Sequence, residues 1–144
     1  ATAAWLDDRA ARDPVAFVRG AAVQVLADGW HDDDTLARLR AVGSRGTGDK
    51  AEARRDAEAC RVAVRAVAAG WPMRADTYPW LIERAADDDH PEASRAALEL
   101  LAADPGWRAA AETIDVLRTA ASSAGQPQTR QTAIRLLAVI QPTS

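Results

Sequence analysis

The chain has 144 residues, a formal net charge of −3 and 48% hydrophobic residues, with alanine the most frequent. This length fits one domain that can fold without a metal or a disulfide, and the charge excludes a general attraction to nucleic acid or acidic membranes. No apolar run approaches the about 18 residues of a membrane span, and the start lacks signal-peptide features. The lone Cys60 has no intrachain partner, which favours a reducing compartment. We therefore expect a cytoplasmic protein.

Alanine-rich segments without β-branched runs predict an all-α fold. Proline at the first helical position is expected to start three helices, at Pro14, Pro91 and Pro127. Asp13 would cap the first of these helices, and Gly29 would end it. In chain order, the expected helices cover roughly residues 2–12, 14–28, 33–42, 50–69, 76–87, 91–103, 107–122 and 127–140.

Two registers repeat along the sequence. In the first, a threonine is followed four residues later by a leucine, at Thr2/Leu6, Thr35/Leu39, Thr77/Leu81 and Thr113/Leu117. In the second, segments with matching aliphatic patterns are aligned on four alanines, which we call the aligned alanines: Ala22, Ala63, Ala97 and Ala133. Self-similarity at this period is typical of a repeat array with two helices in each repeat. We expect hairpins 1 to 4 at about residues 1–30, 31–72, 73–107 and 108–144, each with a first helix A and a second helix B.

The repeat register also predicts the core. On the A helices, we expect the recurrent leucines to be buried: Leu6, Leu39, Leu81 and Leu117. On the B helices, we expect the aligned alanines and the aliphatic residues one and four positions after them to be buried: Ala22, Val23, Leu26, Ala63, Val64, Val67, Ala97, Leu98, Leu101, Ala133, Ile134 and Leu137.

Paired helices at this period, with the Asp13-Pro14 entry and Val18-Arg19-x-x-Ala22 in a B helix, resemble the HEAT repeat. The resemblance implies a right-handed α-α superhelix of four HEAT-like hairpins, with about eight helices in one armadillo-like α-solenoid domain. The linkage Gly29-Trp-x-Asp-Asp-x-Thr-Leu36 looks like HEAT-type arrays of bacterial STAND or NACHT signalling ATPases, where repeats act as sensor or interaction regions. Cys60 and Ser94 depart from the pattern, because arginine stands at their register in hairpins 1 and 4. Any Asp–Arg ladder between repeats is therefore expected to be incomplete.

The same register suggests a fragment of a longer protein. Trp5-Leu-x-x-Arg-Ala-Ala11 matches Trp80-Leu-x-x-Arg-Ala-Ala86, so Ala1 falls where Asp76 would cap hairpin 3. The last B helix stays apolar through Leu136–Ile140, although terminal repeats usually carry a polar outer face. A parent protein would then carry any ATPase outside this chain.

Three features of the sequence are candidates for sites of chemistry. The segment Gly43–Lys50 departs from the phosphate-loop pattern, because Asp49 separates Gly48 from Lys50, and it predicts an inter-helix loop. The clusters His31–Asp34 and Asp87–His90 could offer metal ligands, but they stand where helices need caps. Cys60 lies mid-helix among small apolar residues, which favours packing over nucleophilic chemistry. We expect no enzymatic activity, no cofactor and no metal within this chain.

Five tryptophans stand out in a chain with one phenylalanine and one tyrosine. Three of them, Trp30, Trp71 and Trp107, stand at the junctions between hairpins. The other two, Trp5 and Trp80, share one position on the A helices. They are expected to pack between consecutive helix pairs. An alternative is that one or two are exposed anchors for a partner.

The B helices also carry polar residues two positions before and after each aligned alanine. These pairs are Gly20/Gln24, Arg61/Arg65, Arg95/Glu99 and Gln131/Arg135. Residues four apart share a helix face, so we expect a ladder on a concave surface. From it we select five candidate partner-binding residues: Arg61, Arg65, Arg95, Glu99 and Arg135. Ordinary solvated arginines, or an Arg95–Glu99 ion pair, would give the same pattern.

The preferred function is a non-catalytic protein-interaction or sensing scaffold. Its partner would be a protein or an acidic peptide, since arginine suits carboxylate recognition. Two alternatives stay open: a HEAT-like nucleic-acid-binding or base-excision protein, which the acidic net charge disfavours, and a structural spacer in a larger ATPase.

Overall fold

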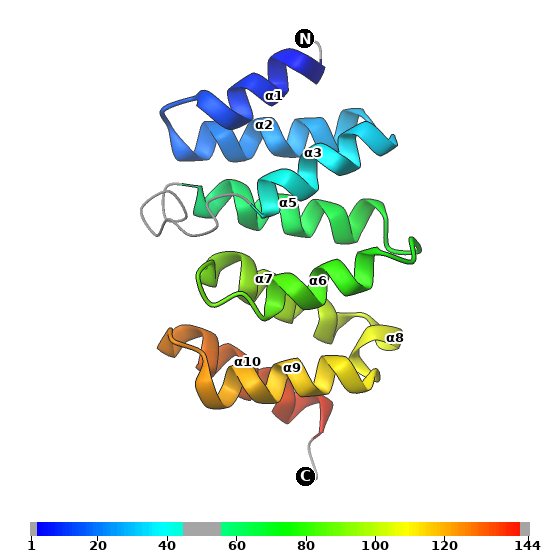
Figure 1. Cartoon of the computed structure of the whole chain (residues 1–144), viewed down its shortest axis with the longest axis vertical. Coiled ribbons are helices and arrows are strands. Elements are labelled where there is room, and N and C mark those ends of the chain that lie inside the picture. Colours follow the sequence, from blue (N-terminus) through cyan, green and yellow to red (C-terminus); the bar gives the residue numbers. More distant parts are fainter. Residues whose placement is uncertain (1–2, 45–55, 142–144) are drawn as a thin grey trace. The chain divides into compact units, whose positions relative to one another are not determined.

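The computed structural model describes residues 3–44 and 56–141, and within these residues all regular secondary structure is α-helical (Figure 1). The expected all-α fold of paired helices is confirmed. The chain divides into two compact units, an N-terminal unit of Ala1–Met73 and a C-terminal unit of Arg74–Ser144. Among the described helices, none combines the length and apolarity needed to cross a membrane.

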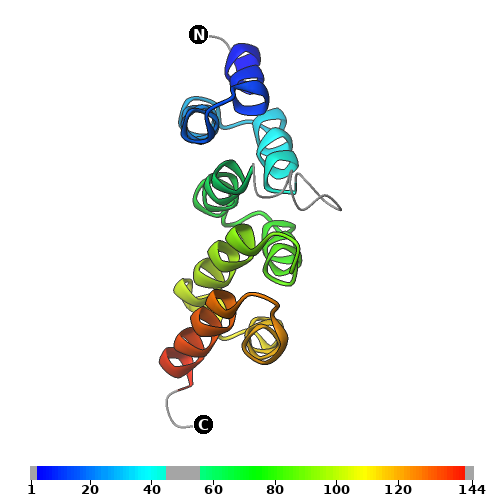
Figure 2. The ribbon, with the colours of Figure 1, turned by 90° about the vertical axis from the view of Figure 1, so that its left-hand side faces the viewer.

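The N-terminal unit contains two helix pairs. Its helices are α1 (Ala3–Arg12), α2 (Ala16–Gly29), α3 (Asp33–Gly43) and α5 (Ala57–Gly70). The B helices α2 and α5 contact each other, α1 packs on α2, and α3 packs on α5. Figure 2 shows this unit as two layers, with α1 and α3 on one side and α2 and α5 on the other.

The C-terminal unit repeats this arrangement. Its helices are α6 (Thr77–Ala85), α7 (Pro91–Ala103), α8 (Pro105–Arg108), α9 (Ala111–Ser123) and α10 (Pro127–Ile140). The B helices α7 and α10 contact each other, α6 packs on α7, and α9 packs on α10. The sequence had predicted one helix over residues 107–122. Instead the chain turns at Ala109 and Ala110, after the short helix α8 that Asp104 caps through the N–H groups of Gly106 and Trp107, at 2.9 and 3.0 Å.

The prolines start two of the three helices as expected. Pro91 and Pro127 occupy the first turns of α7 and α10. The prediction for Pro14 is wrong, because Val15 is the N-cap residue of α2 and Asp13 Oδ1 accepts from its backbone N–H at 3.0 Å. The carboxylate therefore orders the turn before the helix. At the other end Gly29 is the last helical residue and Trp30 follows in an extended conformation, so the expected glycine cap is displaced by one residue.

The core follows the repeat register closely. All four recurrent leucines are buried, and so are the predicted B-helix residues of α2, α5 and α7. The three described recurrent threonines, Thr35, Thr77 and Thr113, are buried as well. The register fails on α10, where Ile134 is 57% exposed and Leu137 is half-buried. The reason is that no described helix follows α10 in the stacking sequence to cover these side chains, whereas α7 is covered by α9 and α10.

One position on each B helix closes its hairpin. The residue three before the aligned alanine donates a hydrogen bond to a backbone carbonyl at the end of the preceding A helix. The bonds run from Arg19 Nη1 to Asp13 O (2.7 Å), from Cys60 Sγ to Val42 O (3.1 Å), from Ser94 Oγ to Ala85 O (2.7 Å) and from Arg130 Nη1 to Ala124 O (2.6 Å). The last carbonyls of a helix have no partner within the helix, so these donors satisfy groups that packing would otherwise bury unpaired. At this position, cysteine and serine side chains thus donate the same kind of hydrogen bond as arginine.

Arg19 also links two hairpins within the N-terminal unit. Its Nε lies 3.5 Å from Asp56 Oδ1, the N-cap residue of α5, and the two side chains are only 2% and 7% exposed. A buried ion pair is costly to break, because each charge left alone has lost its water. The pair therefore couples the first hairpin to α5.

The burial difference at one register position gives a direct test. Leu98→Ala should lower the free energy of unfolding by about 2–5 kcal/mol, because Leu98 is fully buried and its truncation leaves a cavity. Ile134→Ala is the matched control at the same register and should cost under about 1 kcal/mol, because the side chain is exposed. Urea unfolding followed by circular dichroism measures both, and equal losses would show that the assigned burial is wrong.

The buried ion pair gives a second test. Arg19→Met should destabilise the chain by about 3–5 kcal/mol, since it strands the Asp56 carboxylate in the interior. The double variant Arg19→Met/Asp56→Leu should recover the part of that loss that comes from the stranded carboxylate, because two apolar groups need no partner. The part that comes from the lost hydrogen bond to the Asp13 carbonyl should remain. The same urea titration applies, with Arg12→Met on exposed α1 surface as the control. Full stability of Arg19→Met would rule out the coupling.

Candidate interaction surface

Each unit has a candidate site on the exposed faces of its own B helices. In the N-terminal unit, Gln24 on α2 and Arg65 on α5 occupy the same repeat position on neighbouring helices, and both residues are exposed. Arg61 is half-buried, and Gly20 is buried. An ideal Cβ on Gly20 would lie 3.2 Å from Glu58 Cγ, so this glycine serves the close approach of α2 and α5 rather than an open surface.

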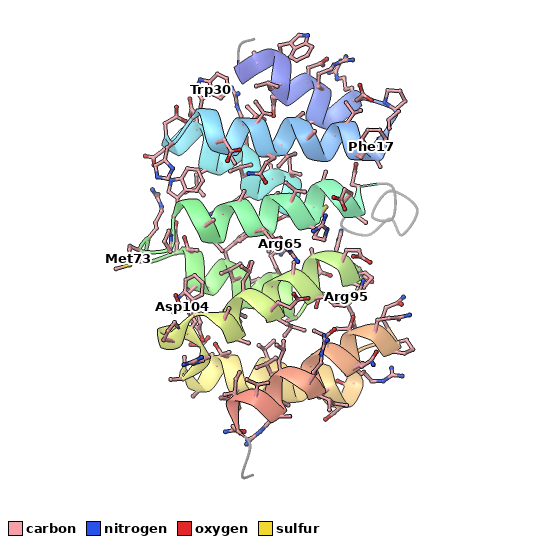
Figure 3. The ribbon with its side chains drawn as sticks, turned by 180° about the vertical axis from the view of Figure 1, so that it is seen from behind. Phe17, Trp30, Arg65, Met73, Arg95 and Asp104 are labelled. Atoms are coloured by element: carbon pink, nitrogen blue, oxygen red, sulfur yellow. The ribbon has the colours of Figure 1, made fainter. Side chains whose placement is uncertain are left out.

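The C-terminal unit presents the corresponding row on α7 and α10. Glu99, Gln131 and Arg135 are exposed, and Arg95 is half-buried. Figure 3 shows Arg65 on α5 of the N-terminal unit and Arg95 on α7 of the C-terminal unit. Each unit therefore carries its own part of the predicted ladder, with one opposite-charge combination, Glu99 and Arg135, on the adjacent helices α7 and α10.

Two of the candidate arginines form local ion pairs. Arg61 pairs with Glu58, with its Nε 3.1 Å from Glu58 Oε2, and Arg95 pairs in the same register with Glu92. These pairs join residues three apart on one helix, which is a spacing that brings side chains together. From the sequence, Glu99 is a possible partner of Arg95, whereas the structure pairs Arg95 with Glu92 and Arg61 with Glu58. The repeated Glu-x-x-Arg spacing was the available signal.

The pairs change the charge of this surface. Glu58 and Glu92 locally neutralise the half-buried arginines Arg61 and Arg95. The exposed arginines of the row are Arg65 and Arg135. Half-exposed pairs of this kind contribute little to stability, typically about 0–1 kcal/mol. Their main effect is on recognition, since a neutral Glu–Arg pair attracts an acidic partner less than an arginine alone.

The tryptophans divide between packing and exposure. Trp71 is buried and stacks on His31, with ring centroids 4.3 Å apart and planes inclined by 7°. Trp107 lies against Tyr78 at 6.2 Å, and the Tyr78 hydroxyl is 2.9 Å from Thr113 Oγ1. Trp5 is different, because it is 57% exposed on α1.

Trp30 and Trp80 are half-buried, and Arg84 lies over the Trp80 ring at 5.9 Å. The packing interpretation therefore holds for Trp71, because its ring is buried at the end of α5 against His31. Among the five tryptophans, Trp5 is the one whose side chain is largely exposed.

The first acidic cluster caps a helix, whereas the second forms contacts within the turn before α7. Asp32 Oδ1 accepts from the backbone N–H and from the hydroxyl of Thr35, both at 2.8 Å, at the start of α3. These two hydrogen bonds hold the pKa of Asp32 below its ordinary value, and the bond from the backbone N–H has the larger effect. Near α7, Asp87 Oδ2 lies 2.9 Å from Nδ1 of the buried His90. Within the described ranges, no three His, Cys, Asp or Glu side chains are grouped to hold a metal ion.

The remaining candidate sites are a buried cysteine, a segment that is only partly described and a small pocket. Cys60 is buried and donates to the Val42 carbonyl. Of the segment Gly43–Lys50, residues 45–50 lie outside the described residues. A pocket of about 70 Å³ lies among α6, α7, α9 and α10, lined in part by Asp88, Ser94 and Thr129. Ligand pockets usually measure about 300–1,000 Å³, so this space suits water rather than a substrate.

The chain was compared with protein-family models, with curated proteins and with solved structures, and none of them matches it.

The Asp32 cap predicts a pH-dependent stability. Because the pKa of Asp32 is lowered on folding, its ionised form contributes stability above the ordinary carboxyl pKa, and this is lost as the pH falls through the lowered value. Asp32→Asn keeps an acceptor oxygen but removes the charge, so it should melt below the wild type near neutral pH, with a gap that closes in acid. Thermal unfolding over a pH series tests this, with the exposed mid-helix Asp115→Asn as control. A gap that is independent of pH would contradict the assignment.

Proposed function

We propose that the chain is a non-catalytic protein-interaction or sensing module, a HEAT-like repeat segment that offers the exposed faces of its B helices to a partner protein. One observation carries the proposal. At the aligned position all four B helices bear a buried alanine, whereas two residues later they bear four exposed side chains of varied chemistry: Gln24, Arg65, Glu99 and Arg135. A constant framework with a variable surface row is what a repeat scaffold needs in order to recognise a partner.

The charges of the row favour a partner of mixed character with carboxylates at chosen places. Arg65 and Arg135 would provide the carboxylate contacts, because a guanidinium binds a carboxylate through two parallel hydrogen bonds. The Glu58–Arg61 and Glu92–Arg95 pairs reduce the general attraction to a polyacidic chain. A net charge of −3 gives no support to nucleic-acid binding. The resemblance to repeat regions of STAND and NACHT signalling ATPases supports a sensing role in a larger protein.

A site-specific crosslinking experiment identifies the partner. A photoreactive amino acid at Gln24, on the exposed face of α2, is compared with the same amino acid at exposed Ala37 on α3. With expression in cells of the source organism, we expect a defined crosslinked product from position 24 and none from position 37. Equal crosslinking from both positions would argue for a structural spacer with no preferred face.

Charge reversal then tests the contact. With the purified partner, Arg65→Glu/Arg135→Glu should weaken binding more than about tenfold, because each change replaces an attraction with a repulsion. The melting temperature should stay nearly constant, since both residues are exposed. The matched control is Arg12→Glu/Arg108→Glu, on α1 and α8, with the same change of charge. Unaltered affinity, measured by isothermal titration calorimetry, would remove the B-helix face and direct attention to Trp5.

A further inference from the structure

The small pocket of the C-terminal unit lies between hairpins 3 and 4. It has a volume of about 70 Å³ and is lined by residues of α6, α7, α9 and α10 and of the turns that join them. Ala86, Asp88 and Ser123 are exposed and form its rim. Ser94 and Thr129 are buried and form its floor. The pocket contains none of the exposed B-helix residues on which the proposed function rests, so it is an independent feature of the fold.

Thr129 brings to this floor a hydroxyl that the protein does not satisfy. The residue is only 2% exposed, and its Oγ1 is buried without a hydrogen-bond partner among the described residues. At the same repeat position, four residues before the aligned alanine, the other B helices carry Val18, Ala59 and Ala93, which have no polar side-chain atom. The large majority of buried polar side-chain atoms have a partner in native structures. We therefore expect a bound molecule to supply the partner of Thr129.

Two further polar groups of the pocket offer lone pairs. Ser94 Oγ donates its proton to Ala85 O at 2.7 Å, so towards a ligand this hydroxyl can only accept. Asp88 adds a carboxylate, and both of its oxygens lie 3.3 Å from the backbone N of Gly125. Among the described residues that line the pocket, none is a lysine, an arginine or a histidine. A ligand must therefore donate hydrogen bonds, and a positive charge on it would complement Asp88.

The nearby cations of the protein are engaged elsewhere. Arg84 Nη1 lies 3.4 Å from Asp87 Oδ2, and Arg130 Nη1 donates to Ala124 O at 2.6 Å. Neither arginine forms an ion pair with Asp88 within the part of the chain that the structure describes. The charge of Asp88 is thus left for a ligand to balance.

The volume and the walls determine the size and the shape of that ligand. A cavity of about 150 Å³ holds benzene with its six carbon atoms, so the pocket accommodates roughly three heavy atoms, too few for a whole substrate molecule. The walls between the polar groups are apolar, and they include Ala85, Val116, Ala120 and Ala124. Methylene groups suit such walls, whereas the polar groups call for a compact donor with a positive charge.

We propose that the pocket binds the end of a primary alkylammonium group, with the nitrogen held by the Asp88 carboxylate and the hydroxyls of Ser94 and Thr129. An ammonium group has three N–H donors and no acceptor, which matches these three acceptors. The group has two sources, a lysine side chain of a partner protein and a small free amine, and either would enter across the exposed rim. Binding of so few atoms is weak, with a dissociation constant no lower than about 1 mM.

An NMR titration of the whole chain with propylammonium chloride at constant ionic strength tests the proposal. The backbone amide signals of Asp88 and Gly125 should shift and reach saturation in the millimolar range. Asp88→Asn keeps an acceptor oxygen but removes the charge, and Thr129→Val removes the hydroxyl at nearly constant shape. Each variant should weaken binding more than about fivefold, because each removes one acceptor interaction of the ammonium group.

Controls separate the pocket from the acidic turn around it. Asp89→Asn removes an exposed carboxylate of the same turn that does not line the pocket, and it should bind as the wild type does. Tetramethylammonium has the charge without an N–H donor, and 1-propanol has the stem without the charge, so both should bind more than about tenfold more weakly. Ser123→Leu places a large side chain on the exposed rim and should block entry. Circular dichroism verifies that each variant is folded.

A blocked tripeptide with a central lysine between two glycines distinguishes the two sources. Binding of the tripeptide together with propylammonium supports a lysine of a partner protein, and binding of propylammonium alone supports a free amine. Shifts that never saturate, or an equal response to tetramethylammonium, would mean that cations only screen the turn, and the proposal would be overturned. Unchanged affinity in both Asp88→Asn and Thr129→Val would overturn it as well, and the pocket would then hold water alone.

Discussion

The hairpins of this chain depend on one hydrogen bond, made by the residue three before each aligned alanine to a carbonyl at the end of the preceding A helix. A helix end leaves carbonyls without partners, and burying one unsatisfied costs about 1–3 kcal/mol. In this fold the A-helix ends are covered by the B helices, so each B helix must bring its own donor. Arg19, Cys60, Ser94 and Arg130 do so with three different side chains. The bond sets the position of the B helix along its partner, and the small aligned alanine then allows the helices to meet closely.

This construction separates framework from surface. The donor, the aligned alanine and the aliphatic residues after it are turned inward on α2, α5 and α7, so their chemistry is restricted by packing. The residue two after the alanine is exposed on all four B helices and is free to vary. Substitutions at this exposed position can therefore change binding specificity without disturbing the core. The local pairs Glu58–Arg61 and Glu92–Arg95 belong to the border between the two regions, where half-buried arginines are neutralised by the preceding turn.

By itself, the sequence determined what local physics controls. Alanine-rich segments with a helical period, prolines at the starts of α7 and α10, and the register of leucines and aligned alanines identified the helices and most of the core, because helix propensity and burial period are properties of neighbouring residues. It also placed Arg65, Glu99 and Arg135 on exposed faces correctly. It did not predict the start of α2 at Ala16 or the turn at Ala109 and Ala110, since boundaries depend on what the flanking residues contact.

Only the tertiary structure decided which residues at matching repeat positions share the same burial and the same contacts. Ile134 matches the buried Leu98 in register, yet it is exposed, because burial requires a covering helix and not only an apolar residue. Cys60 and Ser94 looked like departures from Arg19 and became its counterparts, because a short side chain reaches a carbonyl that lies close and a long one reaches a carbonyl farther away. The choice of Glu92 rather than Glu99 as the ion-pair partner shown for Arg95 likewise rests on side-chain conformation. Burial and the hairpin hydrogen bonds depend on the distance between elements, which a pattern of residues along one helix does not contain.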